Sequence, residues 1–531
     1  MKKLLFLSLF LLVNIVQALA FDYTDANGVT WTCSAGSDGT AIITGATGYG
    51  TEVTVPDMVR DGAQPYITTA LSGTFKDSTK IIRVTLPETI KTIGSNSFYG
   101  CSNLVAIEGT ENVTYIGGSA FQKCSSLTSI DIPLVTTIDK QVFYYCSSLV
   151  AVNMPSVSVV GYRAFYYSSA LKAVDLPKVT SIGADAFCGC SSLASVNLPM
   201  VTSIGNDAFY NTRIIEVSLP ATLQSLGYSA FYSAVKIVLA STTPPKLVVR
   251  TNGTDFSSNT ILIVPEASLA AYKSANVWNK YAGQMFSQSE KVDYDVTTTA
   301  QDNTSSLHDI IGEDNLDKVV SLKVKGTING YDIMILRNKM ANLHLLDLSE
   351  AHIVANPYQY YVGYHTEDNV VGPCAFRSLY KLVSLKLPNS ATSIGDEAVM
   401  NCWNLREVVL PNKLVTIGGN AFSSCSGLKK VEFPPTLKYI GEGAFGFCSS
   451  LEQVELPGVE TIGRLAFGNC DKIKFIRIPS TVKSLGTEAF YADGIKDVYV
   501  YTVEPIKISE SMFKDYTTTT LHIPTQSFNN Y

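Results

Sequence analysis

The chain repeats one sequence unit every 21 to 23 residues, and this period constrains its fold more than any other feature. The unit contains the pairs Leu-Pro, Ile-Gly and Ala-Phe followed by Cys-Ser-Ser, and its clearest copy runs from Leu171 to Ser192. A steady period of this length is typical of leucine-rich-repeat solenoids. The apolar residue that opens the unit recurs at Leu104, Leu127, Leu149, Leu171, Leu193, Ile214 and Val235, and again at Leu382, Leu405, Leu428, Leu451, Ile473 and Ile495.

The first half of the unit predicts a short β-strand. In the clearest copy, apolar Val174 and Leu176 flank polar Asp175. Because side chains alternate between the two faces of a strand, the apolar pair should enter the core while Asp175 faces water. Pro177 follows and has no N-H to offer a neighbouring strand, so the strand should end there.

The second half of the unit predicts a turn and a large inward side chain. Ile182 forms a second apolar pulse, and Gly183 is expected to turn the chain with a positive φ. Ala186 is small enough to let backbones approach, and the Phe187 ring should fill the middle of the coil. Stacking such units about 4.8 Å apart would join their strands into a parallel sheet and make the core continuous.

The predicted fold class is therefore an α/β repeat solenoid, β-dominated, with two leucine-rich-repeat-type stacks, parallel β-sheets, caps and a linker. The expected divisions are a signal peptide at 1–20, an N-terminal cap at 21–80, a first leucine-rich repeat array at 81–240, a closing unit with a helix at 241–290, a linker and cap of the second array with a Tyr-rich insertion at 291–381, a second leucine-rich repeat array at 382–495 and an incomplete closing unit at 496–531.

The N-terminus predicts export. Lys2 and Lys3 precede an apolar run, and small residues end at Ala20, which is the pattern of a secretory signal peptide cut before Phe21. The residue after the cut is Phe, whereas a bacterial lipoprotein carries Cys there, and no later apolar run is long enough for a transmembrane segment. The mature protein is expected to be secreted or cell-surface associated, not cytoplasmic.

Between the arrays the sequence predicts a cap for the first stack, a linker and the beginning of the second stack. Pro265 is a favoured residue at the first position of a helix, and this helix is expected over Glu266 to Val277. Asp293 to Ser306 is rich in Thr, Asp and Asn and is expected to be a linker. A strand over Val319 to Val324 and a helix over Tyr331 to Met340 should then begin the second stack.

The C-terminal residues match the first closing unit only in part. Ile523-Pro524 corresponds to Val264-Pro265, which places Tyr531 midway through the counterpart of the closing helix. We expect either an imperfectly closed second stack or a sequence that is cut short.

Composition and motifs argue against nucleic-acid binding, metal binding and catalysis. Charged residues are 16% of the chain and the net charge of -6 is spread without long runs, whereas phosphate binding draws on clustered Lys and Arg. The five His residues show no metal-ligand spacing, and the chain has no Walker loop, Gly-x-Ser-x-Gly or dinucleotide motif. No enzyme activity, cofactor or metal is expected.

Eight of the eleven cysteines occupy the same repeat position and are expected to form a buried column of thiols. Stacked side chains about 4.8 Å apart are farther from each other than a disulfide prefers, and Ser168 and Thr212 take the same position in other copies. Cys188-Gly189-Cys190 is the one place where redox activity stays open. The column comprises Cys101, Cys124, Cys146, Cys190, Cys402, Cys425, Cys448 and Cys470.

Three outward-facing groups are candidates for contact with a partner. An acidic-polar ribbon along the first sheet contains Glu108, Asp131 and Asp175. A tyrosine stripe after the Ala-Phe pair could instead pack one flank of the coil, and the Tyr-rich insertion from Ala351 to Pro373 could be an ordered loop over its side. The stripe consists of Tyr99, Tyr144, Tyr166, Tyr210 and Tyr232, and the insertion contributes Tyr360, Tyr361 and Tyr364.

The repeats at Val179 to Ser192 and Val415 to Ser426, with the closing stretches Thr242 to Pro245 and Val264 to Tyr272, resemble the BspA-like leucine-rich repeat family. The resemblance covers nearly all of the mature chain. It implies a solenoid and a role in adhesion to host matrix proteins, in co-aggregation or in cell attachment. We therefore expect a multivalent binding surface for a protein or glycan partner. The alternatives are a structural or self-associating scaffold and, more remotely, a glycan-active enzyme.

Overall fold

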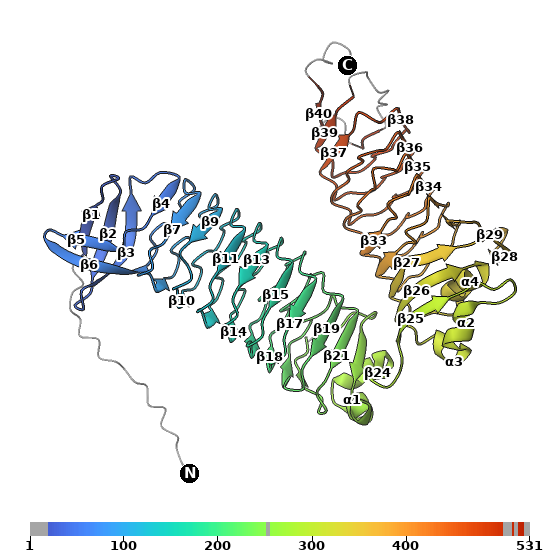
Figure 1. Cartoon of the computed structure of the whole chain (residues 1–531), viewed down its shortest axis with the longest axis horizontal. Coiled ribbons are helices and arrows are strands. Elements are labelled where there is room, and N and C mark those ends of the chain that lie inside the picture. Colours follow the sequence, from blue (N-terminus) through green and yellow to red (C-terminus); the bar gives the residue numbers. More distant parts are fainter. Residues whose placement is uncertain (1–19, 251–254, 503–511, 515–518, 525–531) are drawn as a thin grey trace. The chain divides into compact units, whose positions relative to one another are not determined.

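The computed structural model describes residues 20–250, 255–502, 512–514 and 519–524. The chain divides into two compact units, Met1–Ser289 and Glu290–Tyr531. Each unit is a β-dominated solenoid of stacked coils (Figure 1). The expected signal peptide lies outside the described residues except for Ala20, and so does most of the C-terminal segment that includes Tyr531.

The first unit begins with a small sheet that caps the stack. Its antiparallel strands β1 to β3 continue through β6 into the coils, because β3 pairs with β6 and β6 with β8, both in parallel. Phe75 in this cap stacks on Phe98 of the next coil with ring centroids 5.4 Å apart. The cap strands are β1 (Ala20–Thr24), β2 (Thr30–Ala35), β3 (Thr40–Thr47), β4 (Glu52–Thr54), β5 (Met58–Asp61) and β6 (Gln64–Leu71).

Two rows of parallel strands then run along the first unit. The longer row comprises β7 (Arg83–Thr85), β9 (Ala106–Glu108), β11 (Ser129–Asp131), β13 (Ala151–Asn153), β15 (Ala173–Asp175), β17 (Ser195–Asn197), β19 (Glu216–Leu219), β21 (Lys236–Leu239), β23 (Ile261–Val264) and β24 (Met285–Ser287). The shorter row comprises β8 (Thr92–Ile93), β10 (Tyr115–Ile116), β12 (Thr137–Ile138), β14 (Val159–Val160), β16 (Ser181–Ile182), β18 (Ser203–Ile204), β20 (Ser225–Leu226) and β22 (Lys246–Leu247).

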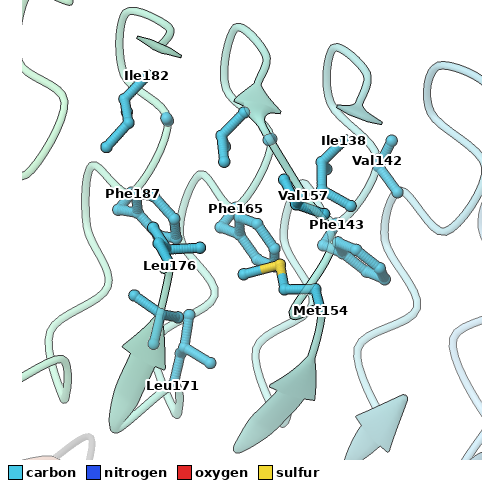
Figure 2. Close-up of a cluster of buried hydrophobic side chains, with 14 of the residues drawn as sticks. Ile138, Val142, Phe143, Met154, Val157, Phe165, Leu171, Leu176, Ile182 and Phe187 are labelled. Atoms are coloured by element: carbon cyan, nitrogen blue, oxygen red, sulfur yellow. The ribbon is translucent and has the colours of Figure 1, made fainter. Parts of the chain in front are cut away.

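The predicted alternation within the strands is confirmed. Val174 and Leu176 are buried, whereas Asp175 between them is exposed, and β15 ends at Asp175, shortly before Pro177. The side chain after Ala186 also points inward, because Phe187 is fully buried. Figure 2 shows Phe187 beside Phe165 and among the aliphatic side chains of neighbouring strands.

The buried phenylalanines form a continuous stack along the first unit. Neighbouring ring centroids lie 5.0 Å apart between Phe143 and Phe165 and again between Phe165 and Phe187, with planes inclined by 20° and 5°. The backbone N-H of Phe165 donates to the carbonyl of Ala186 in the next coil at 2.7 Å. Each coil is therefore joined to the next by backbone hydrogen bonds on the phenylalanine side as well as in both strand rows.

The predicted positive φ at Gly183 is wrong. Gly183 does not have a positive φ. A Cβ built on it would lie 2.7 Å from the backbone of Gly161 and Tyr162, so the glycine is needed for the close approach of adjacent coils. The left-handed conformations of this coil fall instead on Asp185 at 57° and Gly189 at 77°, two residues before and two residues after Phe187.

The closing helix of the first unit is shorter than predicted. A 3-10 turn, η1 (Glu266–Ser268), leads into α1 (Leu269–Ser274), and η2 (Trp278–Gln284) follows. The helix stops after Ser274 because Ala275 is extended and Val277 has a φ of 74°. Buried Tyr272 and Trp278 anchor the closing unit by donating to the carbonyls of Ser241 and Pro245.

The predicted linker at Asp293 to Ser306 is wrong. Its first part is β25 (Asp293–Thr298), which pairs in parallel with β26 (Ser321–Ile328). Tyr294, Val296 and Thr298 are buried and alternate with exposed residues, so the segment is a half-buried strand whose polar residues face water. Two short helices follow, α2 (Ser306–Ile311) and α3 (Glu313–Leu316).

The predicted strand and helix that open the second stack are present with shifted bounds. They are β26 and α4 (Gly330–Asn338), whose start is capped by Asn329 and Asp332. The second unit continues with β27 (Leu345–Ile353), β31 (Ser384–Lys386), β33 (Glu407–Val409), β37 (Phe475–Ile478), β39 (Asp497–Val500) and β40 (Thr520–His522) in one face. Its other face holds β30 (Val370–Val371), β32 (Ser393–Ile394), β34 (Thr416–Ile417), β35 (Tyr439–Ile440), β36 (Thr461–Ile462) and β38 (Ser484–Leu485).

The close approach of adjacent coils at Gly183 predicts that a larger residue there destabilises the fold. Substituting Gly183→Ala should lower the free energy of unfolding by about 1 to 3 kcal/mol, because the added methyl group overlaps backbone atoms that cannot rotate away. Gly283→Ala is the matched control, since a Cβ there meets nothing within 4 Å and the residue is exposed. Urea denaturation followed by circular dichroism measures both. Equal stability of the two variants would contradict the prediction.

Candidate binding surface

Four tyrosines of two adjacent coils form a dense aromatic group on the first unit. Tyr144 stacks on Tyr166 with centroids 5.1 Å apart and planes at 10°, and Tyr145 stacks on Tyr167 at 5.3 Å and 11°. The two pairs contact each other, since the Tyr144 and Tyr145 rings lie 4.7 Å apart. We call these four residues the tyrosine patch.

The outer layer of the tyrosine patch is not part of the stripe expected from the sequence. Tyr145 and Tyr167 are 41% and 39% exposed, whereas the stripe residues Tyr144 and Tyr166 are half-buried. Tyr145 and Tyr167 adopt left-handed conformations with φ of 58° and 57°, which turn their rings outward. The available signal is the Tyr-Tyr doublet in both coils, because its second member directly precedes the inward position of the cysteine column.

The tyrosine patch is held by its surroundings. The backbone N-H of Tyr145 donates to the carbonyl of Tyr166 at 2.8 Å, so the coil-to-coil ladder fixes the ring positions. The Arg163 guanidinium carbon lies 5.0 Å from the Tyr166 ring centre and its Nε pairs with Asp185 at 3.1 Å. Burial raises the pKa of Tyr166 from 10.0 to about 12.

The other predicted stripe tyrosines lie apart from the tyrosine patch. Tyr99 sits between the ammonium groups of Lys76 and Lys123, each 5.7 Å from its ring centre. Tyr210 and Tyr232 contact each other with centroids 5.7 Å apart. Cys188 occupies the intervening position, so the predicted stripe is divided into separate groups.

The acidic-polar ribbon is largely paired with its own neighbours. Glu108 forms an ion pair with Arg83 on the adjacent strand at 2.5 Å. The side-chain amide of Asn153 donates to the carboxylate of Asp131 at 2.8 Å, and Asn197 donates to Asp175 in the same way at 2.9 Å. These cross-strand contacts stabilise the sheet and leave the ribbon less available to a partner.

The Tyr-rich insertion is a hairpin that packs on α4. Its strands are β28 (Asn356–Tyr361) and β29 (Tyr364–Thr366), which pair antiparallel. Tyr360 is buried and donates its hydroxyl to the Pro373 carbonyl at 2.8 Å, so its candidacy as a contact residue is wrong. The guanidinium carbon of Arg337 lies 4.2 Å from the ring centre of Tyr361. The ring of Tyr361 also lies near that of Tyr364, and both tyrosines are exposed.

The cysteine side chains point inward, as the repeat position predicted. The Cys124 thiol donates to the Phe98 carbonyl of the preceding coil at 3.0 Å, and Cys190 donates to Phe165 at 3.1 Å. Ser168 makes the same contact to Phe143 at 2.8 Å, which explains why serine can replace cysteine in this column.

Cys188 is a free and buried thiol, and burial disfavours redox chemistry there. Burial raises the pKa of its thiol to about 12. The reactive form of a cysteine is the thiolate, which is scarce at neutral pH when the pKa is this high. In the described part of the chain, no cluster of three or more His, Cys, Asp or Glu side chains is placed to hold a metal ion, and no helix there is long and apolar enough to cross a membrane.

Parallel strands in rows, an inward phenylalanine stack and outward flank residues define a leucine-rich-repeat solenoid. The signature described as "BspA type Leucine rich repeat region (6 copies)" matches residues 68–178, 158–260, 369–496 and 429–531. The chain therefore belongs to the BspA-type leucine-rich repeat family. This confirms the family and the fold class expected from the repeats.

Two solved structures of bacterial leucine-rich repeat proteins are similar to this chain over most of its length. A leucine rich cell surface protein from Faecalibacterium prausnitzii A2-165 is 21% identical, with 96% of this chain and 97% of that chain covered and a TM-score of 0.34. A leucine-rich repeat protein from Bacteroides ovatus ATCC 8483 is 19% identical, with 77% and 98% covered and a TM-score of 0.35. No curated protein matches the chain.

The buried thiols predict that the protein becomes less stable at alkaline pH. Burial raises the pKa of Cys101, Cys402 and Cys470 from 9.0 to about 12. Their stabilising contribution is complete below pH 9.0 and is lost as the pH rises toward 12, because the unfolded chain releases these protons first. We expect the free energy of unfolding to fall progressively above about pH 9. An unchanged value up to about pH 11 would contradict this.

Thiol labelling at about pH 8 gives an independent check. The folded protein should react slowly with a thiol-specific disulfide reagent, whereas the denatured chain should titrate eleven thiols. The control for folding is the variant Cys146→Ser. Its free energy of unfolding should fall by less than about 1 kcal/mol, because a serine hydroxyl can donate the same hydrogen bond as the thiol. Rapid reaction of the folded protein would exclude a buried column.

Proposed function

We propose that this protein is exported and acts as a non-enzymatic binding or adhesion surface for a macromolecular partner, a protein or a glycan. Its membership of the BspA-type family supports a leucine-rich-repeat surface protein. The N-terminal pattern from Lys2 to Ala20 supports export to the cell surface or beyond. The observation that carries the proposal is the tyrosine patch.

The tyrosine patch suits a binding surface because its outer rings are both exposed and fixed. Tyrosine offers a large apolar face and a hydroxyl that can donate or accept, and it loses little conformational freedom on binding. The stacked pairs 5.1 Å and 5.3 Å apart are already arranged before a partner arrives. A preorganised surface avoids part of the ordering cost that weakens association.

Weak contacts along the solenoid would combine. Tyr210 and Tyr232 form a second aromatic group on the same stripe of the first unit. A partner that engages more than one group gains affinity because the later contacts are intramolecular. The proposed partner is therefore an extended or multivalent one, such as a matrix protein or a glycan-bearing cell surface.

The double substitution Tyr145→Asn and Tyr167→Asn tests this role. Asn211 holds the same position in a later coil with a φ of 57°, so asparagine fits the left-handed backbone. We expect the double variant to keep its thermal unfolding midpoint and to bind about tenfold more weakly, because exposed aromatic anchors carry most of the binding energy at such surfaces. Binding is measured to immobilised fibronectin, collagen and mucin and to whole cells.

The matched control is Tyr115→Thr on the shorter strand row of the same unit. Tyr115 is exposed, and threonine holds its position at Thr92 and Thr137. This variant should bind as the unchanged protein does. Unaltered binding of the folded double variant would reject the tyrosine patch, and concentration-dependent light scattering without any foreign ligand would favour a self-associating scaffold.

A further inference from the structure

A second exposed aromatic site lies on the second unit and contains none of the residues of the tyrosine patch. It is an open hollow of about 570 Å³ whose lining includes Trp403, Ser424, Phe447, Ser449, Asn469 and Asp471. These residues directly precede or follow the buried cysteines of four successive coils. We call this the aromatic hollow.

The aromatic hollow has two exposed aromatic walls. Trp403 is 52% exposed and Phe447 is 58% exposed. The exposed Tyr380 lies beside Trp403 with ring centroids 4.7 Å apart and extends that wall by one coil. Trp403 occupies a position that later coils fill with Ser426 and Ser449, so an indole there is not required by the repeat.

Phe447 is a bulky residue at a position that is left-handed in successive coils, as it is at Tyr145 and Tyr167 in the first unit. It has a φ of 61°, at a position where neighbouring coils carry Asn401, Ser424 and Asn469. A bulky residue in the left-handed region costs about 1 to 2 kcal/mol. Burial does not offset that cost, because more than half of the side chain is exposed. Strain without a packing benefit is a sign of a functional role.

The rest of the described lining is polar and uncharged except for Asp471. Among the described residues, none forms a hydrogen bond with the side chains of Ser424, Ser449 or Asn469. Asp471 accepts a hydrogen bond from the Asp493 backbone N-H at 3.0 Å. Within the described part of the chain, no lysine or arginine lines the aromatic hollow.

We propose that the aromatic hollow binds a neutral, extended oligosaccharide. The C-H faces of a pyranose ring pack against aromatic faces, which are large, apolar and electron-rich. Its hydroxyls need donors and acceptors, which Ser424, Ser449, Asn469 and Asp471 offer. An apolar wall combined with a few oriented polar groups is the usual composition of a small-molecule site.

The coil spacing suits a chain of sugars. The buried rings of Phe422, Phe445 and Phe467 lie 5.1 Å and 5.5 Å apart, which measures the rise per coil. Trp403 and Phe447 are two coils apart. One coil is about as thick as one sugar residue is long in an extended chain. A sugar chain that runs along the stack would therefore place one ring against Trp403, which follows Cys402, and another ring two coils on against Phe447, which precedes Cys448.

The same lining disfavours other ligand classes. A sulfated or phosphorylated chain would meet the Asp471 carboxylate, and the described lining contains no lysine or arginine. Lys514 interacts with Asp471 but is already paired with Asp493. A protein partner normally anchors its hot spots in closely packed pockets that exclude water, whereas the aromatic hollow is open and has several serine hydroxyls in its lining. Both classes are included as competing outcomes of the test.

Intrinsic fluorescence of the full-length protein reports this site selectively. The chain has three tryptophans, and Trp31 and Trp278 are buried at 0% and 1% exposure. A ligand in the aromatic hollow should shift the Trp403 emission to shorter wavelength and protect it from acrylamide quenching. The probes are β-1,4-linked tetrasaccharides of glucose and of N-acetylglucosamine, with a heparin tetrasaccharide and gelatin as competitors of other classes.

The variants Phe447→Asn and Trp403→Ser place neighbouring-coil residues in the aromatic hollow. Phe447→Asn should keep the fold and lower the affinity for the neutral tetrasaccharide about tenfold. This loss is near the upper end of the energy expected for one aromatic contact. Trp403→Ser removes the fluorescent reporter, so its binding is measured by calorimetry. This variant should no longer bind the tetrasaccharide. Tyr439→Thr is the control, since exposed Tyr439 lies in β35 and neighbouring strands hold threonine at Thr416 and Thr461; its affinity should not change.

Two results would overturn the proposal. One is protection of Trp403 by heparin or gelatin when neither neutral tetrasaccharide protects it. The other is an unchanged tetrasaccharide affinity in the folded Phe447→Asn variant. Failure here leaves the proposed function standing, because the tyrosine patch lies in the first unit and is tested by other substitutions.

Discussion

The close pairing of each coil with the next is the constraint on which the whole molecule depends. Phenylalanine rings 5.0 Å apart stack inside, and on the same side the Phe165 N-H donates to the Ala186 carbonyl of the following coil. Since each repeat contacts mainly its neighbours, stability is shared along the array and the ends need covers. The cap strands β1 to β6 and the closing residues Tyr272 and Trp278 supply those covers for the first unit.

This pairing also determines where partner contacts can arise. The residues that flank the inward cysteine vary between coils, and the backbone ladder holds them in place. The tyrosine patch and the aromatic hollow use these flank positions in different units, through Tyr145 and Tyr167 in one and Trp403 and Phe447 in the other. Both sites combine rigid aromatic rings with a fixed spacing, which favours extended partners.

Several features were predictable because they depend on local periodicity, and others were not. The strand alternation at Val174 to Leu176 and the inward Phe187 follow directly from the repeat. The sequence favours a turn at Gly183, but the requirement for glycine arises from a neighbouring coil that sequence spacing does not show. The segment at Asp293 to Thr298 resembles a linker because its outward residues are polar, and only its pairing with β26 reveals a strand.

The sequence by itself determined the solenoid, its two arrays, the inward phenylalanines and the cysteine column, because a regular period repeats the same burial pattern in every coil. Only the tertiary structure decided which outward residues form a surface. Tyr360 is buried against the Pro373 carbonyl, and Tyr145 and Tyr167 are turned outward by left-handed backbone conformations. The physical reason is that exposure depends on contacts between coils and on local φ, neither of which a one-dimensional period encodes.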